Sequence, residues 1–481
     1  MLISALILCV TTSCNTNTSF KPVKPELSVS ADHRYLVLEN GNPFLWLGGT
    51  VWGMSEWLSR EEIDIYLNDR KSKGFNVVQI CLFWGKREDD PVGFTVNPTN
   101  YYGFKAFRET DGKPDASQPL IIDGGTPLQS NDYWDHVEYI IQSANELDMM
   151  VALLPVWGRR YVNATHANFS EKLFTEAGMA GYGKFLGQKF KSYSNIIWVM
   201  GGDVQPDLGG NYLNHYRAMA EGIIYGITGE RVKWSENSPL WDYALMTYHP
   251  DGAPLRNSSR WFHSDPWLDF NMIETYTHVD SVFVAVQNDY KLTDPVKPTV
   301  LAEPGYENHP SHKGSISEIQ IRRQAWQSMF AGAAGFTYGA FRDSVGNGPI
   351  FSPFKGWEKL LDLEGVKSMK YIRSFCLENN WPSWTPVNDL IIPNPGQGEF
   401  QKVAVKSGPG NDIFIYFPEN KSTLLQLKAH FPVNKDIIFQ WYNTKSGKYS
   451  EKVKISLPED GITFGPPGDW SDAILLLSNR M

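Results

Sequence analysis

Short apolar segments alternate with helix-like segments over residues 44–340, and this alternation constrains the fold more than any other feature of the chain. The apolar segments are nearly continuous, as strands are when a parallel sheet is buried on both faces. Eight such strands with helices between them predict a (β/α)8 TIM barrel, an α/β fold. The predicted strands are Phe44–Trp52, Val77–Phe83, Met150–Trp157, Ile196–Asp203, Ala244–His249, Phe270–Thr275, Thr299–Glu303 and Gly335–Ala340.

Helix-like segments separate most of these strands. The first has a start signal, Ser59 followed by Glu61 and Glu62, and a stop signal, Gly74. The connection between the fifth and sixth strands carries no clear helix, so that unit is expected to be the least regular. The predicted helices are Arg60–Lys73, Tyr133–Leu147, Phe174–Tyr193, Tyr212–Tyr225, Val279–Tyr290 and Ile316–Ala331.

The length of 481 residues exceeds what one hydrophobic core usually supports, so a large domain and a smaller one are expected. The turn Asn40-Gly41 between two apolar runs predicts a hairpin that caps the bottom of the barrel. Beyond a proline-marked junction, short alternating strands predict a C-terminal antiparallel β-sandwich. We expect the barrel with its hairpin over residues 25–386 and the sandwich over residues 387–481. The sandwich either binds glycan or buttresses the barrel, and we favour the buttress.

The N-terminal residues 1–24 are typical of an export signal and tether. Leu2–Val10 is apolar but too short to span a bilayer as a permanent helix. The small residue Ser13 before Cys14 resembles a bacterial lipoprotein signal, in which Cys14 would carry the lipid; ordinary secretion is the alternative. We expect an outer-membrane or periplasmic lipoprotein of a Gram-negative bacterium, or a secreted protein, with no membrane contact other than this anchor.

The net charge and the cysteine content limit the possible binding partners and structural sites. A net charge of −9, with no basic run, makes nucleic acid and anionic membranes poor candidates. Beyond the signal only Cys81 and Cys376 remain, in an apolar strand and an amphipathic helix, and both are predicted to be buried thiols. Two cysteines provide neither a disulfide framework nor a metal knuckle. No cofactor and no metal are predicted, and the sequence leaves the oligomeric state open.

Two of the predicted strands end in a carboxylic acid. Asp203 ends the fourth strand and Glu303 the seventh, which places them across the C-terminal mouth, where barrels build their active sites. Such a pair can cleave a glycosidic bond: one group protonates the leaving oxygen, while the other attacks the anomeric carbon or activates water. Glu307 and Asp343 are further acids near the mouth and compete for these roles.

Other residues at strand ends are expected to contact the polysaccharide or oligosaccharide, as hydrogen-bond donors or stacking rings. For each tryptophan, packing at the barrel rim is an equal alternative. Two long insertions, residues 85–129 and 251–269, are expected to form walls of the substrate cleft. The candidate substrate-binding residues are Trp52, Trp84, Trp157, Arg159, Tyr248, His249, His278, Tyr306 and Tyr338.

Five segments together resemble the apiosidase-like glycoside hydrolases. In that family a (β/α)8 catalytic domain carries a C-terminal β-sandwich labelled as collagen-binding. The activity described for the family is release of apiose-linked side chains from the pectin rhamnogalacturonan II in gut Bacteroidetes. The resemblance covers about Leu27 to Met481. The segments are Leu45–Trp52, Trp198–Asp203, Thr247–Pro250, Leu301–Glu307 and Gly332–Gly339.

The resemblance implies a glycoside hydrolase that acts on a plant cell-wall or similar polysaccharide. In the wider group of retaining barrel glycosidases the same two strand ends carry the catalytic acids; by that analogy Asp203 is the general acid/base and Glu303 the nucleophile. The chain departs from the family at Met272–His278, where the family has Ser-Gly-His after the sixth strand. This departure leaves the sugar specificity open.

Two other functions remain as alternatives at this stage. A non-catalytic surface glycan-binding protein would bind sugar in the same cleft without turnover. A metal-dependent hydrolase would need clustered histidine ligands, and no strand carries such a cluster at ligand spacing. The intact acid pair favours the glycosidase over both.

Overall fold

The computed structural model describes most of the chain. Cys14 and Leu2–Val10 lie outside the described residues, so export and lipidation stay predictions. In the described part, no helix combines the length and apolar character that crossing a membrane requires. The described residues are 22–85, 97–166, 171–252, 255–391, 395–408 and 412–479.

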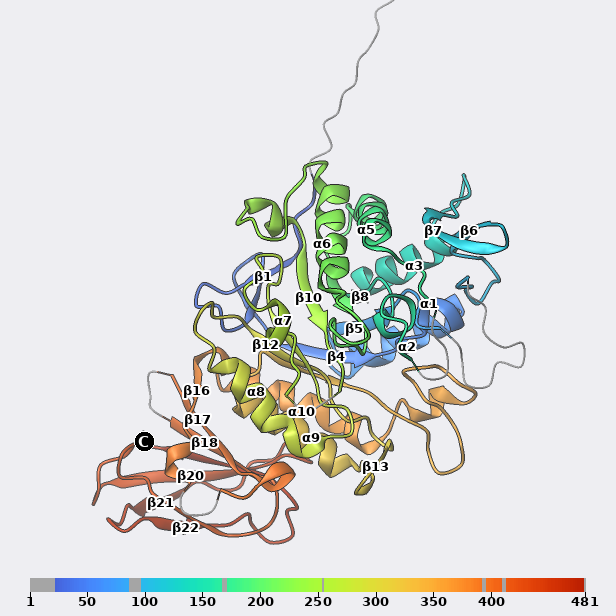
Figure 1. Ribbon diagram of the computed structural model, residues 1–481. Coiled ribbons are helices and arrows are strands. Elements are labelled where there is room, and N and C mark those ends of the chain that lie inside the picture. The colour runs from blue at the N-terminus through green and yellow to red at the C-terminus, as the bar shows by residue number, and fades with distance from the viewer. Residues whose placement is uncertain are drawn as a thin grey trace, which may run out of the picture.

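Eight parallel strands form one nearly closed barrel, so the predicted fold is confirmed (Figure 1). The sheet order is β10-β9-β8-β5-β4-β15-β12-β11, and every residue of these strands is buried. The outermost strands of this order meet where Thr247 Oγ1 donates to the Phe270 carbonyl at 2.7 Å. The strands are β4 (Trp46–Thr50), β5 (Val77–Cys81), β8 (Met150–Leu154), β9 (Ile196–Gly201), β10 (Leu245–His249), β11 (Asn271–Glu274), β12 (Thr299–Glu303) and β15 (Gly335–Tyr338).

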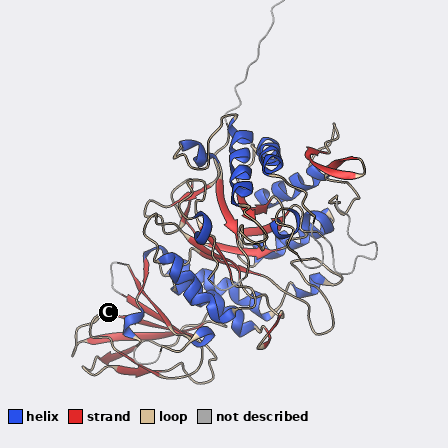
Figure 2. Ribbon diagram, viewed as in Figure 1, coloured by secondary structure: helices blue, strands red, loops and turns tan. Residues whose placement is uncertain are grey.

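Helices surround this barrel (Figure 2). Helix α2 (Arg60–Ser72) begins with a capping box between Ser59 and Glu62, as its sequence predicted. In the described part of the connection between β10 and β11, the helical element is the single turn α7 (Ser259–Phe262). The other α-helices are α1 (Met54–Trp57), α3 (Tyr133–Glu146), α4 (Gly158–Tyr161), α5 (Glu176–Phe190), α6 (Leu213–Thr228), α8 (Val282–Tyr290), α9 (Glu318–Phe330) and α10 (Glu364–Glu378). The 3-10 helices are η1 (Pro239–Tyr243), η2 (Val279–Ser281), η3 (Trp357–Leu360), η4 (Trp381–Ser383), η5 (Asn388–Leu390) and η6 (Gly398–Phe400).

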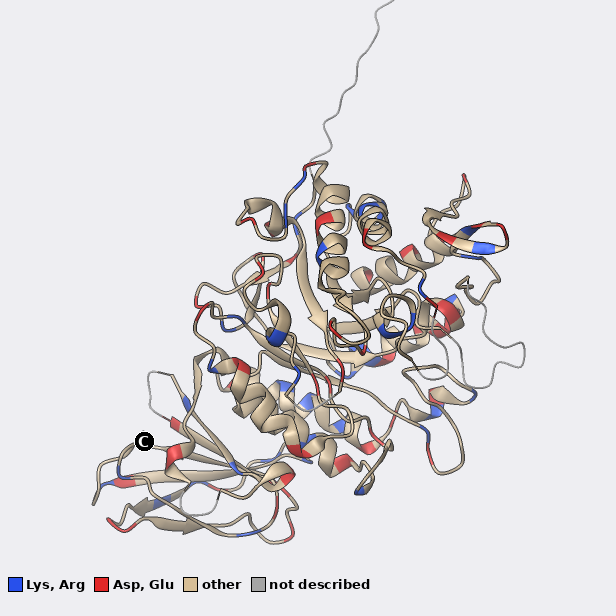
Figure 3. Cartoon of the chain, viewed as in Figure 1, with Lys and Arg blue, Asp and Glu red and all other residues tan. Residues whose placement is uncertain are grey.

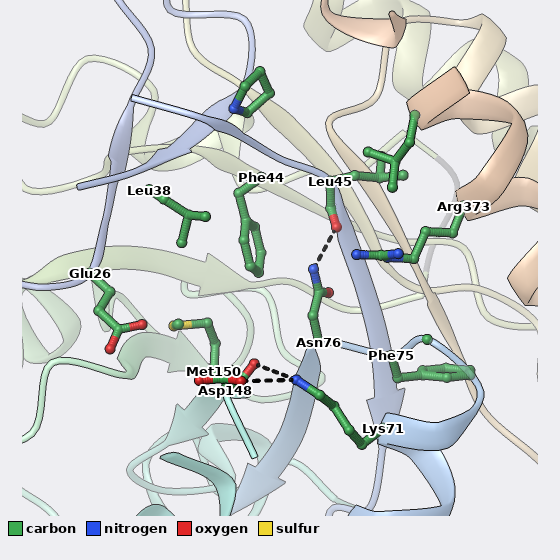
Figure 4. A pocket seen from close by; sticks show the side chains of 13 residues that line it. Glu26, Leu38, Phe44, Leu45, Lys71, Phe75, Asn76, Asp148, Met150 and Arg373 are labelled. Carbon is green, nitrogen blue, oxygen red and sulfur yellow. Dashed lines mark hydrogen bonds and ion pairs between the residues drawn. The ribbon is translucent and has the colours of Figure 1, made fainter. Parts of the chain in front are cut away.

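A small antiparallel sheet lies at the N-terminal end of the barrel strands. Its turn Asn40-Gly41 uses the left-handed region, with φ +80° at the glycine. Leu38 and Phe44 of this sheet line a cavity of about 380 Å³ together with Phe75 and Met150, which stand at the starts of barrel strands (Figure 4). The predicted hairpin therefore lies at the bottom of the barrel, away from the strand ends that carry Asp203 and Glu303. The sheet consists of β1 (Leu27–Val29), β2 (Leu36–Leu38) and β3 (Pro43–Phe44).

Two short hairpins interrupt the barrel sequence. The first lies in the insertion after β5 and packs against α5, where the ring centroids of Phe107 and Tyr182 are 5.8 Å apart. The second follows β12. These hairpins are β6 (Phe107–Thr110) with β7 (Lys113–Pro119), and β13 (Pro310–Ser311) with β14 (Gly314–Ser315).

An antiparallel β-sandwich follows the barrel (Figure 1). Its large sheet has the order β16-β17-β18-β23-β20-β21, and a two-stranded sheet pairs β19 with β22. Because β16 already pairs with β17, the sheet begins at Trp384, before the boundary expected at residue 387. The strands are β16 (Trp384–Pro386), β17 (Val403–Ser407), β18 (Asp412–Phe417), β19 (Thr423–Leu425), β20 (Asp436–Asn443), β21 (Val453–Ser456), β22 (Ile462–Phe464) and β23 (Ala473–Ser478).

The large sheet of the sandwich is covered on both faces. Along β18, Ile413 and Ile415 belong to the core of the sandwich, whereas Phe414 and Tyr416 belong to the core that continues into the barrel. Trp326 of α9 meets this second face, with its ring centroid 6.2 Å from that of Tyr416. The sandwich is therefore placed to support the barrel helices.

The burial of the two cysteines and the distribution of charged residues agree with the sequence analysis. Cys81 in β5 and Cys376 in α10 are free and buried, as predicted. Acidic and basic residues are interspersed over both domains (Figure 3).

A buried ion pair joins the two domains and can be tested. Arg322 Nη2 of α9 lies 2.9 Å from Asp472 Oδ1, with side-chain exposures of 1% and 0%. We expect Arg322→Met to lower the free energy of unfolding by about 3–5 kcal/mol, because it leaves the Asp472 carboxylate buried without its partner. Denaturant unfolding measures this loss. Lys454→Ala is the control: its pair with Asp436 is also short but half exposed, and should contribute less than about 1 kcal/mol. Equal losses in the two variants would contradict the expectation.

Candidate active site

The chain turns sharply between the end of β9 and Asp203. Gly201, Gly202 and Asp203 have positive φ values of 94°, 110° and 49°. A Cβ on Gly201 would stand 2.3 Å from the His249 carbonyl oxygen, so the close approach of β10 requires glycine there. The turn brings the Asp203 side chain to the C-terminal mouth of the barrel, beside Glu303 at the end of β12.

Asp203 pairs with a basic side chain from the neighbouring strand end. Arg159 Nη1, on α4 after β8, donates to Asp203 Oδ2 at 2.9 Å. A quarter of the Asp203 side chain reaches solvent. Burial of the carboxyl group among its neighbours nevertheless raises its pKa to about 6; Arg159 opposes this rise, and the nearby Glu303 adds to it. Asp203 is therefore able to carry a proton near neutral pH.

Each oxygen of Glu303 faces a polar side chain. The Tyr306 hydroxyl donates to Oε1 at 2.5 Å, and the Trp52 indole N–H donates in turn to that hydroxyl at 3.1 Å. His249 Nε2 lies 2.8 Å from Oε2, but the two atoms are not aligned for a hydrogen bond. The chain of donors from Trp52 through Tyr306 fixes the orientation of the carboxyl group.

His249 stands at the centre of the mouth and is fully buried. Its ring packs against those of Trp52 and Trp157, with centroids 5.2 Å and 5.9 Å away. Its Nδ1 lies 2.9 Å from the Pro250 carbonyl oxygen and 3.3 Å from the backbone N–H of Asp203. Trp52 and Trp157 are themselves buried, so they pack beneath the acids and present little ring surface to solvent.

A third acid, Glu274, lies at the mouth, and the sequence analysis did not single it out. It ends β11, and its Oε2 lies 3.6 Å from His249 Nδ1. Burial raises its pKa well above the usual range, and repulsion from Glu303, Asp203 and Asp251 raises it further. The signal was present: an apolar run ends in Glu274, as other runs end in Asp203 and Glu303.

His249, Glu274 and Glu303 form a group that could bind a cation, since each offers one atom and these atoms lie within 4.8 Å of one another. The closest contacts, however, involve opposite nitrogens of one ring: Nε2 with Glu303 and Nδ1 with Glu274. This arrangement fits an imidazole between two carboxyl groups better than ligands around a common centre.

Two of the predicted substrate-binding residues point away from the mouth. Tyr248 packs against Tyr216 of α6, and its hydroxyl donates to the Val204 carbonyl at 2.8 Å. The Tyr338 hydroxyl donates to Glu307 at 2.6 Å, and its buried ring lies on the side of α2. The expectation that these tyrosines face the mouth is wrong, because successive residues of a strand face opposite sides of the sheet.

The two competing acids have structural partners. Glu307 accepts from Tyr338 and from the backbone N–H of Gly365 in α10 at 2.9 Å. Asp343 caps its own loop by accepting from the backbone N–H of Asn347 at 2.8 Å and of Val345 at 3.0 Å. Neither carboxyl group is available for the chemistry at the mouth.

The remaining candidates lie at different distances from the acids. Trp84 is half-buried and continues the aromatic group outward from Trp157, with ring centroids 5.9 Å apart. The Arg160 guanidinium also packs on the Trp84 ring, 4.3 Å from its centroid. His278 precedes η2, and within the described residues its ring has none of the contacts with the acids that His249 has.

A further buried acid, Glu56, binds the backbone of the segment that follows β5. Its Oε2 accepts from the backbone N–H groups of Trp84 at 2.8 Å and Gly85 at 3.1 Å. Burial raises its pKa to about 8, against the lowering effect of these donors and of Arg160. Glu56 thus positions Trp84, and no sequence pattern had indicated it.

Comparisons with known proteins identify the family and the fold. The model of the apiosidase-like catalytic domain matches residues 30–383. A crystal structure of a glycoside hydrolase family 5 protein from Bacteroides vulgatus is 26% identical, with a TM-score of 0.76 over 95% of this chain and 95% of that chain. Another solved structure, described as a glycoside hydrolase, is 25% identical, with a TM-score of 0.76 over 95% of this chain and 97% of that chain.

More distant structures share the fold alone. A β-L-arabinopyranosidase from Geobacillus stearothermophilus is 11% identical, with a TM-score of 0.52 over 91% of this chain and 96% of that chain. No curated protein sequence matches the chain.

The burial of Glu56 predicts a pH-dependent contribution to stability. Its folded pKa of about 8 exceeds the ordinary 4.5, so the protonated group is favoured by folding. Its favourable contribution to the free energy of unfolding is complete below about pH 4.5. Between about pH 4.5 and pH 8 this contribution falls by about 1.4 kcal/mol per pH unit. Glu56→Gln should remove this dependence while keeping an acceptor for Trp84. Unfolding at pH 5, 7 and 9 measures it, with exposed Glu146→Gln as control; parallel curves for wild type and Glu56→Gln would contradict the prediction.

Proposed function

The chain belongs to the apiosidase-like family of glycoside hydrolases, and we propose that it cleaves a pectic or related plant cell-wall polysaccharide with retention of configuration. The observation that carries this proposal is the difference between the environments of Asp203 and Glu303. Asp203 has a pKa raised to about 6, as a proton donor requires. Glu303 faces Tyr306 and His249, which orient it as a nucleophile requires.

In the first step Asp203 protonates the leaving-group oxygen while Glu303 attacks the anomeric carbon. The C–O bond to the leaving group breaks as the bond between the sugar and Glu303 forms, giving a covalent glycosyl-enzyme. Arg159 beside Asp203 stabilises the carboxylate that remains after proton transfer.

In the second step Asp203 takes a proton from water, and the resulting hydroxide attacks the anomeric carbon. The bond to Glu303 breaks, and the sugar leaves with its original configuration. Asp203 ends the cycle protonated, and Glu303 ends it ionised.

The substrate is a carbohydrate, and its finer identity is our proposal. Family membership supports a pectic side chain, of which apiose-linked chains are one class. Export through residues 1–24 would suit an enzyme whose polymeric substrate lies outside the cell. A screen against pectic oligosaccharides, with proton NMR of the first-formed anomer, tests both substrate and stereochemistry. Turnover only of non-pectic glycans would contradict the proposed substrate. First release of the opposite anomer would contradict retention of configuration.

Removing either carboxyl group should abolish most of the activity. We expect Asp203→Asn to lower kcat about 10²–10⁴-fold through loss of proton transfer, and Glu303→Gln to lower it at least as much. Steady-state kinetics on the oligosaccharide found in the screen measures both effects, with Glu307→Gln as a buried control near the mouth. Wild-type activity should be insensitive to chelators. Full activity in either acid variant would end the proposal.

Arg159 should set the alkaline limit of activity. Because its positive charge favours the ionised form of Asp203, Arg159→Met is expected to raise the pKa of Asp203 above about 6, by roughly one unit or more. The proton donor then stays loaded to higher pH, so the alkaline limb of kcat/KM moves upward. Arg256→Met, which removes a looser pair with Asp251 at 3.8 Å, is the control. A limb that stays in place or moves downward would rule out this role.

A further inference from the structure

Two of the three acids at the mouth face a basic side chain at hydrogen-bond distance, and the third does not. Asp203 faces Arg159 at 2.9 Å, and Glu303 faces His249 at 2.8 Å. The basic atom beside Glu274 is His249 Nδ1, which lies 3.6 Å from Oε2. The proposed mechanism assigns roles to Asp203 and Glu303 but none to Glu274.

The Glu274 carboxyl group is enclosed. Its side chain is 3% exposed, and among the described residues Oε2 has no hydrogen-bond partner. A buried carboxylate without a partner is costly, so such a group takes up a proton. The charged groups that face it are acidic Glu303, Asp203 and Asp251, against the basic Arg159 and the His249 ring. This balance also favours the protonated form.

The backbone aims Glu274 at the reacting centre. Strands β11 and β12 pair Ile273 with Leu301 and then Glu274 with Glu303, so Ala302 is skipped by a register shift. Without the shift, Glu274 would pair with Ala302, whose side chain lies on the other face of the strand. Bulges often re-aim side chains at active sites. This one sets the two carboxyl groups side by side.

The loop after β10 leaves room for this carboxyl group. A Cβ on Gly252 would stand 2.7 Å from Glu274 Oε1, so any other residue there would displace the acid. A protonated carboxyl group has an O–H that needs an acceptor. At 3.6 Å His249 Nδ1 is too far to be one.

We propose that Glu274 is a substrate-binding residue whose carboxyl O–H donates a hydrogen bond to the hydroxyl group next to the anomeric carbon of the sugar bound against Glu303. The subsite thereby selects a neutral sugar with that hydroxyl free, since a uronate would meet three acids. This inference rests on the proposed function.

Substitution of Glu274 by Gln and by Ala separates the roles that it could have. Glu274→Gln keeps a neutral donor in nearly the same volume, and kcat/KM should stay within about tenfold of wild type. Glu274→Ala removes the donor, and kcat/KM should fall about 10²–10³-fold, by analogy with other single donors at reacting centres. A loss in Glu274→Gln as large as in Glu303→Gln would mean that Glu274 acts as a carboxylate, which overturns the inference and leaves the glycosidase intact.

A deoxy substrate tests the contact itself. The probes are the 4-nitrophenyl glycoside of the sugar that wild type releases and its counterpart lacking the hydroxyl next to the anomeric carbon. Wild type and Glu274→Gln should prefer the first probe strongly, and Glu274→Ala should lose most of that preference. Glu307→Gln is the matched control and should keep it. If wild type and folded Glu274→Ala showed the same preference for the hydroxylated probe over the deoxy probe, the inference would be overturned.

The pH dependence of KM gives an independent readout. Deprotonation of Glu274 removes the donor and adds a fourth negative charge near Asp203, Glu303 and Asp251. KM of wild type should therefore rise at alkaline pH, whereas KM of Glu274→Gln should not. Parallel KM profiles would count against the inference. Full activity in Glu303→Gln would instead contradict the proposed function.

Discussion

The buried imidazole of His249 is the contact on which the mouth of the barrel depends. The ring lies beside Glu303 and Glu274, its Nδ1 is 3.3 Å from the Asp203 backbone nitrogen, and it packs against Trp52 and Trp157. Five strand ends therefore converge on one ring. Because this ring and its neighbours exclude water, the three acids share a poorly solvated space with few basic groups. Burial in this space raises the pKa of Asp203 and the pKa of Glu274, so these two groups bind protons more readily than exposed acids do. A proton donor and a carboxylate can then exist side by side.

The rest of the barrel keeps that arrangement in place through a division between its two faces. His249 points inward to the acids, while its neighbour Tyr248 points outward and joins β10 to α6. In the same way the Glu303 side chain lies at the mouth, whereas Glu307 accepts hydrogen bonds from Tyr338 and from Gly365 at the start of α10. The lower end of the barrel is closed around the cavity lined by Leu38 and Phe44, where Asn76 also donates to the Leu45 carbonyl and Lys71 pairs with Asp148 (Figure 4). Chemistry and stability are thus assigned to opposite ends of the same strands.

The β-sandwich extends this support. Its large sheet presents Tyr416 to α9, and Arg322 and Arg323 of α9 reach Asp472 and Glu399 beyond the end of the barrel. Both ion pairs are largely buried, so separating the domains would expose apolar surface and unpaired charges together. Helix α9 follows β12 and the β13–β14 hairpin in the chain and precedes β15, so it connects the sandwich to the part of the barrel that carries Glu303.

The sequence by itself determined the strands, most helices, their capping signals and the acids Asp203 and Glu303, because these follow from local patterns of apolar and turn residues. Only the tertiary structure decided which side chains meet. Tyr248 and His249 are adjacent in sequence, yet they face opposite sides of the sheet. A shift of one residue in the register of β10 would exchange the side chain that faces the mouth. Glu274 ends an apolar run, but a register shift against β12 brings it to the site; Glu56 acts through its burial and has no local signature. Which acid faces Arg159, which faces His249 and which is left alone depends on distances across the barrel, and these exist only once the strands have closed.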